Sequence, residues 1–236
     1  MSDPKTFLVV GGATGIGAAV VRHQQSLGNE LIVTSRDPDK INSGNGITVQ
    51  AYDVTQHPDQ KLDLPETLDG VVYCPGTITL KAFHRMTRAD FERDMEINLY
   101  GAVEVIQRAL PALKRAPGAS IVLFSSIAAS TGLGFHASIA AAKGAVEGFG
   151  RSLAAELAPR TRVNVIAPSL TDTPLASSLL SSPQKRDASA ARHPLQTLGD
   201  PHDVAELVSF LLGPSSTFMT GQVLRPDGGL SSVRLF

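Results

Sequence analysis

The sequence has little cysteine and no excess of charge of either sign. Its one cysteine, Cys74, excludes an intrachain disulfide and a thiolate cluster for zinc, so we expect a reducing compartment and no metal site. The 21 basic and 22 acidic residues give a net charge of -1 without a basic block. We therefore expect no nucleic-acid partner and no electrostatic membrane anchor, and a small molecule or another protein as the partner.

Long hydrophobic runs and low-complexity tracts are also missing. The apolar run in MSDPKTFLVV is too short to cross a membrane and lacks a signal-peptide cleavage pattern. These absences predict a cytoplasmic protein without membrane association. No repeat or linker divides the 236 residues, and a 42% apolar composition allows a sizeable core, so one domain is expected over residues 1–236.

Strand-like and helix-like segments alternate along the chain, which predicts an α/β fold with a parallel sheet. Residues 6–10 are continuously apolar and β-branched, as in a strand covered on both faces. The predicted strands are 6–10, 30–35, 47–51, 68–73, 119–124, 161–167 and 221–226, and the predicted helices are 18–27, 87–114, 137–157 and 202–212. Within helix 87–114 we expect a buried stripe of Met95, Leu99, Val103 and Ile106, with Asn98 beside it.

Four glycines, Gly11, Gly12, Gly15 and Gly17, join the first predicted strand to the first predicted helix. Glycine permits tight dihedral angles and close approach of a ligand to the backbone, and free N–H groups at a helix start attract a phosphate. The strand before the glycines and the helix after them favour a dinucleotide site over a glycine-rich turn without a ligand.

The second predicted strand ends at Thr34, Ser35 and Arg36, where many dinucleotide sites carry an acid. An acid there would bind a ribose 2′-hydroxyl, whereas an arginine with hydroxyl neighbours favours a 2′-phosphate. The pattern predicts NADP(H) over NAD(H), and the alternative is an ordinary surface arginine. Asp53, after the third strand, is either an acceptor for an adenine amino group or a turn residue.

A lysine in an unusual setting draws attention to residues 125–151. This segment contains a strand end, a glycine-punctuated loop and a helix on which small residues surround Lys143. Small neighbours let other backbone or a ligand approach closely. Ile139, one turn earlier on the same face, can neither give nor take a proton, so the chemistry of this face is uncertain from sequence.

Together these motifs resemble the short-chain dehydrogenase/reductase family over essentially the whole chain. The matching positions are Gly11-x3-Gly15-Ile16-Gly17, Asp53-Val54, Asn98, Ser126, Lys143, Arg162-Val163-Asn164, Pro168, Thr173, Gly221-Gln222 and Asp227-Gly228-Gly229. The resemblance implies one doubly wound Rossmann-type domain, with a seven-stranded parallel sheet and helices on both faces. It also implies a dinucleotide along the C-terminal strand ends, bound by Gly11, Thr14, Gly15, Ile16, Gly17, Ser35, Arg36, Asp53, Val54, Gly76, Asn98, Lys143, Pro168, Thr171 and Thr173.

The family's chemistry is hydride transfer between nicotinamide and a carbonyl or alcohol, with a tyrosine four residues before the lysine as general acid/base. By resemblance, Lys143 would hold the nicotinamide ribose and lower the pKa of that tyrosine, Ser126 would bind the substrate oxygen, and Asn98 would anchor a water. Ile139 occupies the tyrosine position. Further departures are Val10 for Thr, Tyr73-Cys74-Pro75-Gly76 for Asn-Asn-Ala-Gly, and Pro168-Ser169 for Pro-Gly.

A histidine offers one substitute for the missing phenol. His136 lies seven residues before Lys143, the spacing at which enoyl reductases, distant relatives of this family, place their tyrosine. If the helix extends that far, an imidazole there can donate a proton near neutral pH. The alternative is a polar surface histidine without a catalytic role.

Two classes of function remain open at this point. In the first, which we favour, the protein is an NADP(H)-dependent oxidoreductase acting on a small, largely apolar carbonyl or activated alkene, with His136 or a bound water as the acid. In the second, it binds the nucleotide without redox turnover, as a sensor, scaffold or subunit. A lyase or isomerase on the same fold is a third reading.

Residues 169–200, which follow the sixth predicted strand, are rich in Ser, Pro and Ala and lack strong periodicity. We read them as a substrate lid with at most a short helix, the alternative being a flexible insertion. Leu170, Leu175, Leu179 and Leu180 suggest an apolar lid without a Lys or Arg cluster for an anionic substrate.

By resemblance, helices 87–114 and 137–157 form four-helix contacts between subunits. We therefore expect a homodimer or homotetramer. Phe149 and Leu153 are candidate exposed contacts, although their spacing equally fits a place in the protein's own core.

Overall fold

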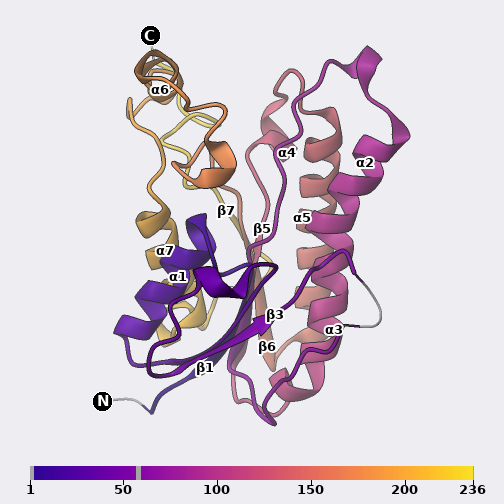
Figure 1. Ribbon diagram of the computed structural model, residues 1–236, viewed down its shortest axis with the longest axis vertical. Helices are drawn as coiled ribbons and strands as arrows, with labels where there is room; N and C mark the ends of the chain where they lie inside the picture. The colour runs from indigo at the N-terminus through magenta and orange to yellow at the C-terminus, as the bar shows by residue number, and fades with distance from the viewer. Residues whose placement is uncertain (1–2, 57–59, 236) are drawn as a thin grey trace.

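A computed structural model describes residues 3–56 and 60–235 and contains one seven-stranded sheet (Figure 1). Its order is β3-β2-β1-β4-β5-β6-β7, and every adjacent pair is parallel. The strands are β1 (Thr6–Val10), β2 (Glu30–Ser35), β3 (Ile47–Ala51), β4 (Gly70–Tyr73), β5 (Ala119–Phe124), β6 (Thr161–Ile166) and β7 (Val223–Leu224). The expectation of an α/β fold with a seven-stranded parallel sheet is confirmed.

Helices cover both faces of this sheet, as Figure 1 shows. One face carries α1 (Gly15–Ser26) and α7 (Pro201–Leu212), which pack against each other. The other carries α2 (Arg88–Met95), α3 (Gly101–Leu113) and α5 (Ala137–Leu157), and the shorter helices are α4 (Ala128–Thr131) and α6 (Pro183–Ala190). Each face therefore has its own apolar core, one built around Val105 and Val146 and the other around Val20 and Val208.

The strand boundaries agree closely with the sequence-based expectation because the central strands are apolar on both faces. β5 has six consecutive buried residues and β4 has four. Three strands are shorter than predicted: β4 begins at Gly70, β6 ends at Ile166 and β7 contains only Val223 and Leu224. At Gly70 a Cβ would lie 2.4 Å from the Ser120 carbonyl oxygen, so the backbones of β4 and β5 approach each other there as only glycine allows.

The predicted helix over residues 87–114 is interrupted by a π-helical turn, Glu96–Tyr100, between α2 and α3. A π turn inserts one extra residue into the helical repeat and so rotates the residues that follow. The predicted stripe is therefore wrong in detail: Met95, Leu99 and Val103 are only partly buried. Asn98 lies on the buried side and is 2% exposed, which makes it part of the interior and not a neighbour of the stripe.

The segment that connects β6 to α7, residues 169–200, contains two short helices, η4 (Pro174–Ala176) and α6. A parallel bridge between Thr171 and Gly199 ties its two ends together. In Figure 1 the α6 end of this segment lies beyond one end of the sheet. Across the parts of the chain that the structure describes, we find no helix with the length and apolar character needed to span a membrane.

Candidate cofactor and active site

A cavity of about 840 Å³ opens at the carboxyl ends of the central strands. Gly76 follows β4, Ser126 follows β5 and Pro168 follows β6, and all three line it. Residues from α5 and from segment 169–200 complete the wall. The structure thus brings together Ile16, Gly76, Ser126, His136, Ile139, Lys143, Pro168, Thr171 and Thr173 from the residues expected on sequence.

The glycine turn between β1 and α1 needs its glycines for two different reasons. Gly11 and Gly15 have φ values of 75° and 56°, in the left-handed region that side chains disfavour. At Gly17 a Cβ would lie 2.3 Å from the carbonyl oxygen of Gly11, so Gly17 permits close packing of the turn on the helix. The Thr14 side chain makes no cap hydrogen bond, which leaves the first N–H groups of α1 without a side-chain acceptor.

The end of β2 has the polar groups expected of a ribose-phosphate subsite. Thr34 is buried, and its hydroxyl has no hydrogen-bond partner among the described residues. Ser35 forms a turn with Asp37, whose N–H donates to the Ser35 hydroxyl over 3.0 Å. Arg36 is exposed, and within the described chain it forms no ion pair or hydrogen bond. Asp53 accepts from the N–H and hydroxyl of Thr55, so part of its carboxylate is already engaged by its own turn.

Lys143 is a buried cation at the wall of the cavity. Its Nζ donates to the Phe124 carbonyl oxygen over 2.8 Å, and its side chain comes from the middle of α5. Burial disfavours the ammonium form and lowers the pKa of Lys143 to about 8, although the nearby Asp94 and Cys74 favour the charged form. A Cβ at Gly76 would lie 3.3 Å from both Lys143 Nζ and Asn98 Oδ1, so these two polar atoms lie close to the Gly76 backbone and near each other.

Behind this pair lies a carboxylate that sequence reasoning missed. Asp94 is fully buried, and its Oδ1 accepts from the hydroxyls of Thr77 and Thr79 over 2.6 and 2.8 Å. Asn98 Nδ2 donates to Thr77 Oγ1 and to the Asp94 carbonyl oxygen, which leaves Asn98 Oδ1 buried without a partner among the described residues. The sequence does place Asp94 and Asn98 four residues apart, a spacing that puts two residues on one face of a regular helix. The π turn at Glu96–Tyr100 changes the helical repeat here, so periodicity did not identify the pair.

Ile139 is 4% exposed and contributes only hydrocarbon to the cavity wall. Ser126 Oγ accepts from the Ala128 N–H over 3.2 Å. His136 is the N-cap residue of α5 and therefore lies just outside the helix, where its Nδ1 is 2.6 Å from the Gly134 carbonyl oxygen. The helix does not extend to His136, but the side chain still reaches the cavity.

None of the three tyrosines lines this cavity. Tyr73, whose strand ends near the site, is buried and donates its hydroxyl to the Ile97 carbonyl oxygen over 2.6 Å. Burial raises the pKa of Tyr73 well above its ordinary value. Tyr73 thus holds the π turn and cannot supply the phenol that the position of Ile139 lacks.

Segment 169–200 contributes polar groups that the sequence analysis did not anticipate. Ser169 Oγ lies 2.7 Å from His193 Nε2, and both residues line the cavity. Lys185 and Arg192 also line it, so the lid that the leucines predicted as apolar contributes two cations as well. Their sequence separation concealed them, because α6 and the turn that follows it bring both cations to one wall.

The residues present fit a nicotinamide dinucleotide on the structure's own features. Gly76 and Lys143 line the cavity, and beside them Asn98 Oδ1 is a buried acceptor without a partner among the described residues; a buried acceptor requires a donor. The uncapped start of α1 suits a pyrophosphate. Ribose hydroxyls would satisfy Asn98 and Lys143, and the Arg36 region would hold the adenosine end.

Comparisons with known proteins agree with this geometry. A family model described as enoyl-(acyl carrier protein) reductase matches residues 11–231. A tropinone reductase homolog of Arabidopsis thaliana is 35% identical over 241 residues, covering 95% of this chain and 92% of the relative.

Solved structures agree as well. The ligand-free aldohexose dehydrogenase of Thermoplasma acidophilum superposes with a TM-score of 0.88 at 28% identity, covering 99% of this chain and 96% of that one. A structure of ElxO with NADP bound has a TM-score of 0.85 at 26% identity and covers 98% of this chain and 100% of that one.

Proposed function

The chain belongs to the short-chain dehydrogenase/reductase family, and from that premise we propose that it is an NADP(H)-dependent oxidoreductase. The observation that carries the proposal is the cavity wall at Gly76, where Lys143 Nζ lies beside Asn98 Oδ1, which has no partner among the described residues. Lys143 would donate to the ribose hydroxyls, and Asn98 would accept from one of them or from a water. When bound, the nicotinamide supplies or accepts a hydride, and this chain contributes binding, orientation and proton handling.

The preference for NADP(H) rests on the end of β2. Arg36 is an exposed guanidinium without a protein partner among the described residues, next to the hydroxyls of Thr34 and Ser35. A guanidinium fits a phosphate with two parallel hydrogen bonds, whereas the neighbouring acid, Asp37, is already paired with Lys40 Nζ over 2.7 Å. The solved structure of ElxO with NADP bound is a precedent within the same fold.

The missing acid is the weak point of catalysis. The family places a tyrosine four residues before the lysine, and we assign that position to Ile139. A positioned general acid typically contributes about 10²–10⁴-fold to the rate, whereas juxtaposition of the reacting groups can contribute more. A slower oxidoreductase therefore remains feasible, with His136 or a bound water in the role of the acid.

The cavity wall supports a small substrate with an apolar body. Ile78, Leu133, Leu175 and Leu179 line it, together with Ile139. Lys185 and Arg192 from segment 169–200 add positive charge to one side. We propose a carbonyl compound or an activated alkene as the substrate, covered by segment 169–200 as a lid.

The decisive experiment measures deuteride transfer from labelled NADPH to a panel of ketones, imines and activated alkenes by mass spectrometry. The native protein is compared with Ile139→Tyr, His136→Ala and the control His84→Ala, an exposed histidine outside the cavity wall. We expect slow transfer by the native protein, unchanged in His84→Ala and raised about 10²-fold or more in Ile139→Tyr.

Two results would contradict parts of this proposal. If NADPH binds tightly and neither the native protein nor Ile139→Tyr transfers deuteride to any compound, the protein is a nucleotide-binding protein without redox turnover. If transfer by His136→Ala equals that of the native protein, His136 is not the acid. The absence of any protonatable atom on Ile139 is the observation that keeps the non-redox alternative open.

The coenzyme assignment has a separate test. Arg36→Ala should weaken NADPH binding about 10–100-fold, the loss expected for a charge-assisted hydrogen-bond pair, and leave NADH binding unchanged. Arg22 on α1 is also an exposed arginine, so Arg22→Ala is the matched control. An unchanged ratio of the two affinities in Arg36→Ala would show that Arg36 does not contact the 2′-phosphate.

We also propose a homodimer or homotetramer formed through the outer faces of α3 and α5. Phe149 and Leu153 are half-buried and pack against the protein's own core, so they contribute to an interface only with their outward edges. Tyr100 in the π turn is 49% exposed and adds apolar area to this side. Sedimentation velocity should give a dimer or tetramer, and Tyr100→Glu should dissociate it.

A further inference from the structure

Ser169 and His193 form a hydrogen-bonded pair that the family resemblance does not account for. Ser169 follows β6, where the family has a glycine, and His193 lies just after α6. Ser169 Oγ is 2.7 Å from His193 Nε2, and His193 Nδ1 is 3.0 Å from the Ser189 carbonyl oxygen. A carbonyl only accepts, so Nδ1 carries the proton, and in the neutral ring Nε2 accepts from the Ser169 hydroxyl.

This arrangement has the parts of an activated nucleophile. A hydroxyl lies within hydrogen-bond distance of a base, and a third group fixes the tautomer and orientation of that base. His193 is 4% exposed, so its ring is held by the surrounding protein. Nevertheless both His193 and Ser169 reach the cavity that contains Lys143 and Ile139. A hydroxyl–imidazole pair on a substrate cavity has access to the reacting molecule.

The structure around His193 keeps the ring in place. Gly228 has φ 59°, and a Cβ there would lie 3.2 Å from the His193 Cβ, so this turn packs directly against the histidine. Asp227 lies beside it: although burial raises the pKa of Asp227, hydrogen bonds from Ser231 and Gly229 and the proximity of His193 lower it below the ordinary value.

Ser169 is fixed as firmly as its partner. Its carbonyl oxygen accepts from the Thr171 hydroxyl over 3.1 Å, and its N–H donates to the Pro226 carbonyl oxygen over 3.4 Å. These contacts fix the backbone at Ser169, and the hydrogen bond to His193 orients its hydroxyl on the cavity wall. Fixed geometry is what proton transfer requires, because the donor and acceptor must already lie within hydrogen-bond reach.

We propose that Ser169 is activated by His193 and that this pair, in preference to His136 or a bound water, is the acid/base of the substrate cavity, replacing the phenol that Ile139 lacks. The role in the redox reaction rests on the proposed function, whereas the activation of Ser169 does not. In reduction of a carbonyl, the Ser169 hydroxyl gives its proton to the substrate oxygen as the carbon receives the hydride. For this step His193 has first taken a proton from solvent at Nε2; it passes that proton to Ser169 and returns to the neutral form. Oxidation of an alcohol starts from the neutral ring and reverses each transfer.

The activation can be tested without coenzyme or substrate. A fluorophosphonate reacts with an activated serine: the serine oxygen forms a bond to phosphorus, fluoride leaves, and the imidazole takes the hydroxyl proton. We expect diisopropyl fluorophosphate to modify Ser169, located by peptide mass spectrometry. The rate should fall at least about 10²-fold in His193→Gln, which keeps a donor near the Nε2 position but provides no base.

Ser178→Ala is the matched control, because Ser178 is another cavity hydroxyl on segment 169–200 but has no histidine partner. It should leave the rate of Ser169 modification unchanged. If His193→Gln does not fold, His193→Asn, which keeps the bond from the Nδ1 position to Ser189, serves instead, with circular dichroism as the folding check.

The outcomes separate the two proposals. Modification of Ser169 that depends on His193 supports the pair, even if no deuteride transfer is ever found, in which case the redox function fails and the activated serine remains. No modification, modification of Ser126 or Ser178 in its place, or an unchanged rate in the His193 variants would overturn the activation.

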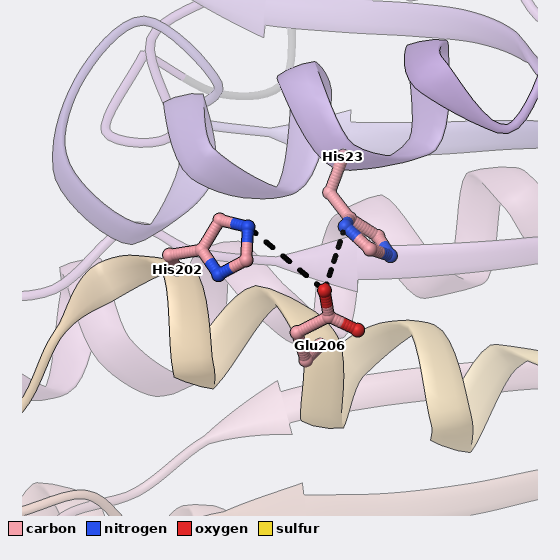
Figure 2. A group of neighbouring side chains, drawn as sticks. All are labelled: His23, His202 and Glu206. Atoms are coloured by element: carbon pink, nitrogen blue, oxygen red, sulfur yellow. Dashed lines mark ion pairs between the residues drawn. The ribbon is translucent and has the colours of Figure 1, made fainter.

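A second and independent observation concerns the contact between α1 and α7. His23 on α1 and His202 and Glu206 on α7 point toward one another, as Figure 2 shows. Glu206 Oε1 lies 3.4 Å from His23 Nδ1 and 3.9 Å from His202 Nε2, and one donor atom from each of the three residues lies within 4.8 Å of the others. None of the three lines the substrate cavity.

We infer that these three residues form a binding site for a zinc-like divalent ion. Donors at about 2.0–2.2 Å from a tetrahedral zinc ion lie about 3.4 Å apart, so the His23–Glu206 distance already fits. His202 must move about half an ångström closer to Glu206, and its donor atom, within 4.8 Å of that of His23, must move at most about 1.4 Å closer to His23. Two imidazoles and a carboxylate suit zinc, cobalt, nickel or copper, with water in the fourth position. His202 is 66% exposed and has the freedom to make this movement.

Calorimetric titration of the metal-free protein with zinc chloride tests this site. We expect one ion per chain and a loss of at least about 10-fold in affinity for His23→Ala, His202→Ala and Glu206→Gln, with His84→Ala unchanged. Zinc should also raise the Tm of the native protein and not that of His202→Ala, because the ion joins α1 to α7. If zinc does not bind, or if it binds equally well to all three variants, these residues are not a metal site. They then form only an ion pair between α1 and α7.

Discussion

The buried charge of Lys143 should make the stability of the protein depend on pH in a defined direction. Burial lowers the pKa of Lys143 from 10.5 to about 8. At about 1.4 kcal/mol per pKa unit, the folded state disfavours the ammonium form by about 3 kcal/mol relative to the unfolded chain. Between the two pKa values the unfolded state binds the extra proton, so stability must rise with pH above about 8.

Lys143→Met removes this titration and keeps most of the side-chain volume. It leaves the Phe124 carbonyl oxygen without its donor, which costs about 1–3 kcal/mol, but that cost does not vary with pH. The free energy of unfolding of the native protein minus that of Lys143→Met should therefore increase by about 1.4 kcal/mol from pH 7 to 9 and continue to rise toward pH 10.

The measurement is urea unfolding at several pH values, followed by far-UV circular dichroism because the chain contains no tryptophan. Cys74 acts with the opposite sign: burial raises the pKa of its thiol to about 12, so it lowers stability as pH rises above about 9. Both proteins contain Cys74, and its contribution largely cancels in the difference. Lys114→Met, at an exposed lysine, should show no pH-dependent difference.

A difference that stays constant from pH 7 to 10 would refute the reasoning. It would mean that the ammonium group is as well solvated in the folded protein as in the unfolded chain. A difference that falls with pH would mean that the surrounding carboxylate outweighs burial.

Three further changes test other parts of the same framework. Gly17→Ala places a Cβ 2.3 Å from the Gly11 carbonyl oxygen. It should destabilise the protein by about 3 kcal/mol in urea unfolding and abolish NADPH binding in a fluorescence titration. Normal NADPH binding would contradict the turn geometry. Asp94→Asn removes a negative charge that favours the ammonium form of Lys143, so the rise in stability with pH should begin at lower pH. If the free energy of unfolding depends on pH as in the native protein, Asp94 does not affect the charge of Lys143. Tyr73→Phe deletes the hydrogen bond to the Ile97 carbonyl oxygen in the π turn and should lower the free energy of unfolding in urea by about 1 kcal/mol. NADPH affinity should not change. A large loss of affinity would place Tyr73 in the cofactor site.

The central strands were predictable from sequence because their burial is encoded locally. In β5 six consecutive residues are apolar or small and all are buried, and a continuous apolar run is typical of a parallel strand covered on both faces. The glycine turn was predictable for the same reason, since the positive φ angles of Gly11 and Gly15 restrict the residue type at those positions. Features of this kind depend on neighbours within a few residues.

The details of the site were less accessible. The burial of Asn98 depends on a π turn, which adds one residue to the helical repeat and so defeats a periodicity argument. Asp94 carries no motif of its own, and its relation to Lys143 on α5 exists only because two helices pack against each other. The cations Lys185 and Arg192 reach the cavity by the course of segment 169–200, which has no regular pattern to read.

By itself, then, the sequence determined the succession of strands and helices expected of an α/β protein, the glycine turn after β1, the lysine of α5 and the absence of a tyrosine four residues before it. Only the tertiary structure decided which side chains share the cavity with Ile139. Ser169 and His193 are 24 residues apart, and His23 and His202 lie on helices at opposite ends of the chain. The physical reason is that such pairs are set by the packing of distant elements, and packing is a property of the folded chain that no local pattern encodes.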